Sequence, residues 1–213
     1  MSIRCNNNTV DTKKIALIIF ARNPELGKCK TRLAKTIGDE AALEIYKHLL
    51  LHTSNVAKSI AADRYIFYSE AIQKKDIWDD GIFKKKRQFE GDLGMKMEHA
   101  FSLIFQMGYD KVIIIGSDLL ELKPKHINQA FQYLNTHDAV IGPAKDGGYY
   151  LLGLTRMHEF LFKNKSWSTP TVLEETLNDL SEKNIKFTTL ETLNDIDTYD
   201  DLLASTYNKN QHI

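Results

Sequence analysis

The sequence lacks the features that mark secreted, membrane-spanning and metal-stapled proteins. Its two cysteines, Cys5 and Cys29, form no CxxC pair and no Cys/His cluster, so neither a disulfide framework nor a structural zinc site is predicted. No apolar run approaches the roughly 18 residues that a membrane-spanning helix needs, and the amino-terminal segment has no apolar signal core. We therefore expect a cytoplasmic chain without a membrane span.

The chain also has no net charge, because 28 Lys and Arg residues balance 28 Asp and Glu residues. A formal charge of zero gives no general attraction to nucleic acids or to anionic membranes. No nucleic-acid partner is expected, and any anionic ligand has to be recognised by a local group of cations.

Linker sequences are absent as well. The 213 residues contain four prolines and 11 glycines, and no Pro/Gly/Ser-rich stretch divides them. This composition favours a single domain over residues 13–207, preceded by a polar, disordered tail at 1–12 and followed by a short tail at 208–213. The sequence does not indicate an oligomeric state.

Apolar runs alternate with amphipathic segments through most of the chain. The runs predict strands at 15–20, 64–69, 112–115, 138–143, 149–154 and 186–192, with a basic strand entry at 84–87. The amphipathic segments predict helices at 39–60, 97–105, 124–135 and 170–183, and short helical pieces at 72–81, at 157–162 and after residue 197. This alternation predicts a three-layer α/β/α fold with a mixed, mostly parallel central sheet.

Asp118 follows the most strongly apolar of the internal strands. Residues 112–115 are Val-Ile-Ile-Ile, and the run ends in Gly116, Ser117 and Asp118. Open α/β sheets bind ligands in the crevice outside the carboxyl ends of their strands, which is where Asp118 is expected. The alternative is that this carboxylate only stabilises a turn.

A basic segment follows the first strand. It reads ARNPELGKCKTRLA and contains Arg22, Lys28, Lys30 and Arg32. A loop at this position is a common phosphate-binding site in α/β proteins, although a solvated surface loop has the same composition. The segment is not a Walker loop, because the upstream Gly is missing and Cys29 follows the first Lys. Phosphate contacts would therefore come from side-chain cations and loop amides.

Two glycine-rich turns are further candidates. Gly91, Asp92 and Gly94 precede a helix and would expose free amides, although Asp92 could simply cap that helix. Asp146 and the two glycines after it form the turn of a predicted hairpin one strand after Asp118, which is a plausible structural role on its own. Trp167 is interpreted either as a core residue or as a stacking platform for a base or sugar.

Four segments in this order resemble one known family. The segments FARNPELGKCKTRLA, EGDLG, GSDLLEL with GPAKDGGYYLLGL, and NDIDTYDDL are similar to the DUF2064 family of glycosyltransferase A-like proteins, over roughly residues 14 to 205. Relatives of that family include the molybdenum-cofactor guanylyltransferase and the phospholactate guanylyltransferase. The resemblance implies the nucleotide-diphospho-sugar transferase fold.

The resemblance also implies a function and a set of roles. It favours a metal-dependent, glycosyltransferase-like enzyme with a nucleotide or nucleotide-sugar donor and a small-molecule acceptor. One alternative is a nucleotidyltransferase that transfers NMP from an NTP to a phosphorylated small molecule, and another is a non-catalytic nucleotide-binding protein. The implied nucleotide and phosphate contacts are Arg22, Lys28, Lys30, Arg32, Gly91, Asp92 and Gly94. The implied acceptor side comprises Gly147, Gly148, Tyr149, Trp167 and Thr169.

Four aspartates carry the implied chemistry. Asp118, Asp195 and Asp197 match the positions expected to hold Mg²⁺ or Mn²⁺, and Asp146 matches the position expected to orient or deprotonate the acceptor. Three positions depart from the family pattern: Leu120 stands where Pro is usual, Lys96 where Arg is usual, and Arg22 where Lys is usual. Leu120 leaves the loop after Asp118 less constrained, and the other two preserve charge while changing the hydrogen-bonding geometry.

Overall fold

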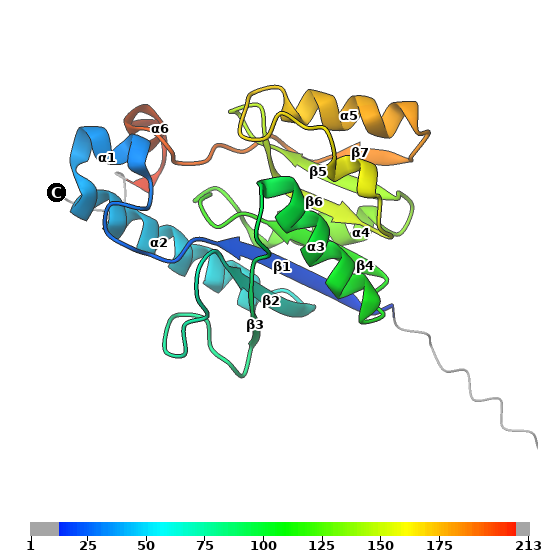
Figure 1. Cartoon of the computed structure of the whole chain (residues 1–213), viewed down its shortest axis with the longest axis horizontal. Coiled ribbons are helices and arrows are strands. Elements are labelled where there is room, and N and C mark those ends of the chain that lie inside the picture. Colours follow the sequence, from blue (N-terminus) through cyan, green and yellow to red (C-terminus); the bar gives the residue numbers. More distant parts are fainter. Residues whose placement is uncertain (1–12, 208–213) are drawn as a thin grey trace, which may run out of the picture.

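The computed structural model describes residues 13–207, in which seven strands form one mixed sheet in the order β3-β2-β1-β4-β6-β5-β7 (Figure 1). The tails predicted at 1–12 and 208–213 lie outside the described residues. The strands are β1 (Ile15–Ala21), β2 (Asp63–Tyr68), β3 (Phe83–Arg87), β4 (Lys111–Ile115), β5 (Ala139–Pro143), β6 (Tyr149–Leu154) and β7 (Phe187–Thr189). The helices are α1 (Thr31–Ile37), α2 (Asp39–Lys58), α3 (Leu93–Gln106), α4 (Pro124–Tyr133), the 3₁₀ helix η1 (Glu159–Phe162), α5 (Val172–Glu182) and α6 (Tyr199–Ala204).

The sheet is mostly parallel, as predicted. Strand β1 pairs in parallel with both β2 and β4, β2 pairs in parallel with β3, and β5 pairs in parallel with β7. Strand β6 is the exception, because it runs antiparallel to its two neighbours β4 and β5. The hairpin between β5 and β6 supplies this reversal, so the predicted mixed sheet is confirmed.

Helices cover both faces of the sheet and make three layers. Alternate residues of β1 point to opposite faces: Leu17 and Ile19 pack in a cluster with α2 and α4, and Ile18 packs in a cluster with α3, η1 and α5. Residues 16–19 of β1 are all fully buried, which explains their uninterrupted apolar run. The predicted three-layer α/β/α architecture is confirmed.

A third apolar cluster ties the chain's end to the segment after β1. Leu33 of α1, Ile196 and Leu202 of α6 pack together with residues of α2. Leu120, in the loop after β4, packs against the same cluster. This contact places residues 28–32 beside residues 195–197, although they are far apart in the sequence.

Two local predictions are wrong. Residues 31–37 form a helix rather than the loop expected for the whole basic segment, because burial of Leu33 stabilises seven residues that carry little periodic signal of their own. Residues 72–81 contain no helix. The carboxylate of Asp76 instead accepts hydrogen bonds from the Tyr68 hydroxyl, the Trp78 amide and the Lys85 ammonium, which fixes an irregular loop.

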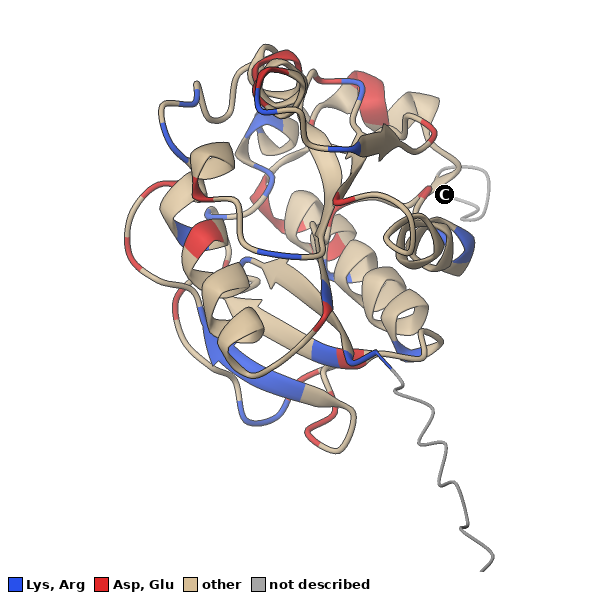
Figure 2. Cartoon of the chain, turned by 90° about the vertical axis from the view of Figure 1, so that its right-hand side faces the viewer, with Lys and Arg blue, Asp and Glu red and all other residues tan. Residues whose placement is uncertain are grey.

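The basic run at residues 84–87 lies in β3, an edge strand of the sheet. Figure 2 shows β3 as a blue strand at the margin of a molecule whose charges of both signs are otherwise interspersed. Lysines on an edge strand hinder pairing with another chain, so this run has a structural explanation. The other elements agree with the predictions to within a few residues at their ends, and β7 is shorter than the strand predicted at 186–192. No helix in residues 13–207 is long and apolar enough to cross a membrane.

Candidate functional site

A cavity of about 890 Å³ opens at the carboxyl ends of β1, β2 and β4. It has the size of small-molecule and cofactor sites, about 300–1,000 Å³. Eight of the residues predicted from the sequence line it: Arg22, Lys28, Lys30, Arg32, Gly91, Asp92, Asp118 and Asp197. The adjacency of β1 and β4 in the sheet explains this arrangement, because their following loops share one edge.

Lys30 and Asp118 meet at the base of this cavity. The Lys30 ammonium lies 3.0 Å from Asp118 Oδ2 and 3.9 Å from Asp197 Oδ1, and its side chain is only 6% exposed. Arg32 Nη1 lies 2.7 Å from Asp197 Oδ2. The packing of Leu120 fixes the loop after β4 without a proline. Asp118 therefore faces the basic segment and the 195–197 segment.

The pKa of Asp118 lies below its ordinary value. Burial alone raises the pKa of this carboxyl group, but the charge and hydrogen bond of Lys30 outweigh it, and the Arg22 guanidinium adds to the effect. Asp118 is therefore ionised at neutral pH and presents a negative charge to the cavity.

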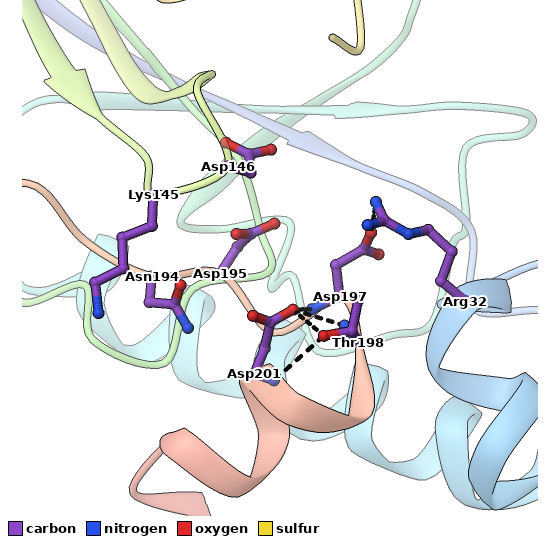
Figure 3. Close-up of a pocket in the computed structure, with 8 residues that line it drawn as sticks. All are labelled: Arg32, Lys145, Asp146, Asn194, Asp195, Asp197, Thr198 and Asp201. Atoms are coloured by element: carbon purple, nitrogen blue, oxygen red, sulfur yellow. Dashed lines mark hydrogen bonds and ion pairs between the residues drawn. The ribbon is translucent and has the colours of Figure 1, made fainter. Parts of the chain in front are cut away.

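A second cavity, of about 170 Å³, adjoins the first, and both are lined by Arg32 and Asp197. Figure 3 shows its lining, to which α1, the β5–β6 turn and the segment entering α6 contribute. The lining residues are Arg32, Lys145, Asp146, Asn194, Asp195, Asp197, Thr198 and Asp201. Asp146 and Asp195, both predicted from the sequence, thus lie next to the larger cavity rather than in its lining.

The pKa of Asp195 is raised to about 6. Burial is the main cause, and the negative charges of Asp118 and Asp146 raise it further. Asp195 and Asp146 line the same cavity. Asp197 differs from them, because Arg32 already neutralises its charge.

The described residues match a known family. Residues 52–169 match the family described as "Uncharacterized protein conserved in bacteria (DUF2064)". The chain belongs to the DUF2064 family.

Some proteins similar to this DUF2064 chain carry names that state an activity. A 2-phospho-L-lactate guanylyltransferase from Methanocaldococcus sp. (strain FS406-22) is 30% identical over 196 residues, which cover 87% of this chain and 82% of the relative. A crystal structure from Desulfovibrio desulfuricans G20, provisionally named a nucleotide-diphospho-sugar transferase, matches with a TM-score of 0.84 and 30% identity, covering 93% of this chain and 89% of that chain. The prediction of a transferase is thereby confirmed at the level of class.

A more distant structure shares the fold alone. Glucosyl-3-phosphoglycerate synthase from Mycobacterium tuberculosis, in complex with Mn²⁺, uridine diphosphate and glucosyl-3-phosphoglycerate, matches with a TM-score of 0.54 and 11% identity over 91% of this chain and 75% of that chain. The predicted nucleotide-diphospho-sugar transferase fold is confirmed by these matches.

The predicted metal ligands of the DUF2064 chain do not form a closed cage. Within residues 13–207, no group of three or more His, Cys, Asp or Glu side chains is placed to hold a metal ion. Asp118 and Asp195 provide oxygen ligands of the kind that Mg²⁺ and Mn²⁺ accept, while Asp197 is held by Arg32. The metal assignment stays a prediction.

The DGGY turn is built against the segment after Trp167. Gly147 has a φ of 88°, and a Cβ atom there would lie 2.1 Å from the carbonyl oxygen of Pro170. The Gly148 amide donates to Asp146 Oδ1 at 2.8 Å, and the Tyr149 ring packs into the cluster of α3 and α5. The turn therefore has the structural role that its composition suggested, and it also orients Asp146.

Trp167 and Gly94 pack against each other. A Cβ atom at Gly94 would lie 2.4 Å from Trp167 Nε1, and Trp167 itself is half-buried against the core. Thr169 donates its hydroxyl hydrogen to the carbonyl of Ser166 at 2.6 Å. Ser168 lines the larger cavity, whereas the predicted residues Trp167 and Thr169 do not.

Asp92 caps α3, because its carboxylate accepts a hydrogen bond from the Met95 amide at 2.9 Å. Helix capping was the alternative role that the sequence suggested for this residue. Lys96, one turn into the same helix, lines the larger cavity. Among the described residues, no carboxylate forms an ion pair with Lys96 or with Arg22. These two cations enter the cavity from different elements, and neither is engaged in an ion pair within the part of the chain that the structure describes.

Several residues that position the site were missed. The Tyr46 hydroxyl accepts from the Arg22 amide at 2.9 Å, bonds the Arg22 carbonyl at 3.1 Å, and lies 3.4 Å from Ser117 Oγ. The buried side chain of Asn23 bonds Ala71 O and the Glu70 amide, joining the loops after β1 and β2. Asn23 lies in the basic segment that the sequence analysis singled out. Tyr46 lies in the middle of α2, where no sequence motif marks it as part of a site.

Proposed function

We propose that this DUF2064 protein is a nucleotidyltransferase, which transfers NMP from an NTP to a small-molecule acceptor and releases pyrophosphate. The observation that carries the proposal is that five cations line one cavity, Arg22, Lys28, Lys30, Arg32 and Lys96, and that two of them form no ion pair with the five carboxylates of the same lining. Arg22 and Lys96 have no ion-pair partner among the described residues. A triphosphate carries more negative charge than a nucleotide-sugar diphosphate, so it benefits most from such a set.

The relatives favour the same choice. The relative at 30% identity is named as a guanylyltransferase. The sugar transferase predicted first remains a second candidate, because the structure at TM-score 0.84 is named for nucleotide-diphospho-sugars. The two reactions differ in their products, since only nucleotidyl transfer releases pyrophosphate.

The order of the strands in the sheet supports one orientation of the nucleotide in the larger cavity. Arg22, Lys30 and Asp118 follow β1 and β4, whereas Ser69, Glu70 and Gln88 follow β2 and β3 on the other side of the same cavity. The proposed phosphate position is over β1 and β4, and the proposed base position is over β2 and β3.

Glu70 makes guanine the proposed base. Its carboxylate lines the cavity and forms no ion pair among the described residues. A carboxylate accepts two hydrogen bonds side by side, which suits the adjacent N1–H and N2–H donors of guanine and no other common base. Glu25, also in the lining, is instead paired with Lys28 at 2.6 Å.

The smaller cavity suits the acceptor. Its volume of about 170 Å³ allows a small molecule, and Lys145 provides a cation for an acidic or phosphorylated group. Asp146 Oδ1 is occupied by the Gly148 amide, which leaves Oδ2 to orient the acceptor hydroxyl or take its proton. This arrangement favours a phosphorylated acceptor with a free oxygen nucleophile.

In the proposed reaction an acceptor oxygen forms a bond to the α-phosphorus of the NTP. The bond from that phosphorus to the oxygen bridging to the β-phosphorus breaks, and its electron pair leaves with pyrophosphate. Lys30, Arg22 and Lys96 would neutralise the charge on the leaving group. Asp118 and Asp195 would hold Mg²⁺ or Mn²⁺, which when bound supplies further charge neutralisation at the phosphates.

The experiment is a product assay on the purified protein. Each of the four NTPs, and a panel of nucleotide sugars, is incubated with Mg²⁺ or Mn²⁺ and a set of phosphorylated hydroxy acids and sugars. The proposal predicts pyrophosphate release that requires an acceptor and is greatest with GTP. Release of a nucleoside diphosphate from a nucleotide sugar would instead favour the sugar transferase.

A further inference from the structure

Lys30 is paired with Asp118, one of the two carboxylates that the proposed function assigns to the divalent cation. Its ammonium is 3.0 Å from Asp118 Oδ2 and 3.9 Å from Asp197 Oδ1. With 6% of its side chain exposed, this lysine is far more buried than lysines usually are. The proposed metal ligand Asp118 thus already has a positive charge of the chain itself as its partner.

The backbone holds Lys30 in this place. The residue has a φ of 50°, a left-handed conformation that is uncommon for a residue other than glycine. Its carbonyl accepts the first hydrogen bond of α1, from the Ala34 amide at 2.8 Å, and the helix is anchored by buried Leu33. Lys28 shows the contrast, because its side chain is 71% exposed and paired with Glu25. The inward direction of Lys30 therefore follows from how α1 starts.

An ammonium and a divalent cation compete for the same carboxylate oxygen. Mg²⁺ and Mn²⁺ bind carboxylate oxygens at close range, and Asp118 Oδ2 is engaged by Lys30. Like charges at such short separation repel each other in a half-buried site. A bound nucleotide removes the conflict, because its phosphate oxygens offer Lys30 another partner within the same cavity.

We infer that Lys30 is an internal counter-cation that occupies the proposed metal ligand Asp118 in the free protein, so that metal binds tightly only together with the nucleotide. This inference rests on the proposed function. Lys30 is a positioning residue here: its ammonium leaves Asp118 for the phosphates and thereby frees the carboxylate. Because binding equilibria are reciprocal, metal and nucleotide strengthen each other's affinity by the same factor.

The first test measures Mn²⁺ binding in the absence of nucleotide, from the electron paramagnetic resonance signal of free Mn²⁺. Lys30→Gln should bind Mn²⁺ at least about tenfold more tightly than the unchanged protein, within the range of typical coupling between sites. Lys35→Gln removes the same charge from the exposed last turn of α1, outside the lining of both cavities, and should leave Mn²⁺ affinity unchanged. Adding Asp118→Asn to Lys30→Gln should abolish the gain.

The second test needs no variant, so it holds even if Lys30→Gln fails to fold. The unchanged protein is titrated with Mn²⁺ with and without a GTP analogue that has a methylene group between its α- and β-phosphorus atoms. The Mn²⁺ bound by the analogue alone is measured without protein and subtracted, and we then expect the Mn²⁺ affinity of the protein to rise at least about tenfold with the analogue. Equal affinity in both titrations, or a folded Lys30→Gln that binds Mn²⁺ no better than the unchanged protein, overturns the inference.

These outcomes are distinct from failure of the proposed function. A gain of Mn²⁺ binding in Lys30→Gln with no pyrophosphate release from any NTP supports the inference and defeats the nucleotidyltransferase. Pyrophosphate release with no gain of Mn²⁺ binding in Lys30→Gln supports the nucleotidyltransferase and overturns the inference.

Discussion

The Tyr46 hydroxyl bonds both polar backbone groups of Arg22, the amide at 2.9 Å and the carbonyl at 3.1 Å. The tyrosine belongs to α2 and the arginine to the segment after β1, so one side chain fixes the start of the proposed phosphate-binding segment.

Removal of that hydroxyl should weaken nucleotide binding and stability together. Tyr46→Phe leaves two backbone groups of Arg22 without this partner, and we expect a loss of about 1–3 kcal/mol in the free energy of unfolding. The KM for the NTP should rise as well. Tyr65→Phe is the control, because its hydroxyl bonds Tyr109 outside both cavities. A KM that rises equally in both variants would contradict the positioning role.

The two unpaired cations of the larger cavity should each contribute to nucleotide affinity. Loss of a charged hydrogen bond costs about 1.5–3 kcal/mol, so Arg22→Gln and Lys96→Gln should each raise the KM for the NTP roughly tenfold or more. The measurement is steady-state kinetics at two salt concentrations. Lys58→Gln, at the exposed end of α2, provides the matched loss of charge and should leave the KM unchanged. Unchanged KM in both cavity variants would place the phosphates elsewhere.

Glu70 should set the choice of base. Glu70→Gln replaces one acceptor oxygen with an NH₂ group, which donates and cannot accept, and a bidentate base contact is worth about 1–3 kcal/mol of discrimination. We expect the preference for GTP over ATP, measured as the ratio of kcat/KM values, to fall at least about fivefold. The control is Glu25→Gln, which alters a carboxylate already paired with Lys28. A preference that survives in Glu70→Gln would show that other groups recognise the base.

Gly147 should be irreplaceable for steric reasons. Gly147→Ala combines a φ of 88° with a Cβ atom 2.1 Å from the Pro170 carbonyl oxygen. We expect a loss of about 2–5 kcal/mol in the free energy of unfolding, the sum of backbone strain and overpacking. Gly108→Ala separates the two causes, because Gly108 has a φ of 79° with nothing within 4 Å of the added atom. Chemical denaturation of both variants should show about 1–2 kcal/mol for Gly108→Ala alone. If both variants lose the same free energy of unfolding, the turn at Gly147 moves away from Pro170 at little energetic cost.

Much of the fold was predictable because burial leaves a strong local mark. The apolar runs of β1 and β4 are fully buried between two helix layers, and such strands are recognisable from composition alone. Asp118 could be predicted for the same reason, since it directly follows one of these strands. Helix α1 could not, because Leu33 packs against residues near the other end of the chain. The loop at 72–81 could not, because its shape depends on hydrogen bonds of the Asp76 side chain that no turn motif in the sequence marks.

The sequence predicted many of the residues that line the larger cavity, but not the contacts between them. The basic segment and Asp118 were identified, yet the sequence did not show that Lys30 is buried between Asp118 and Asp197 or that Arg32 neutralises Asp197. These pairs depend on the cluster that joins α1 to α6, which forms between residues more than 150 positions apart. Tyr46 was missed, and Lys96 was noted only as a departure from the family pattern, because their positions at the cavity depend on which way their helices face.

The central claim is that this protein cleaves an NTP between its α- and β-phosphorus atoms in the presence of an acceptor. The most direct measurement is pyrophosphate release from GTP, with Mg²⁺ or Mn²⁺ and a panel of phosphorylated acceptors, by the unchanged protein and by Asp118→Asn. The account predicts acceptor-dependent release that falls at least about a hundredfold in Asp118→Asn, as for loss of one strong electrostatic contact in a transition state. Release that is equal in the two proteins, or absent with every NTP and acceptor, would contradict it.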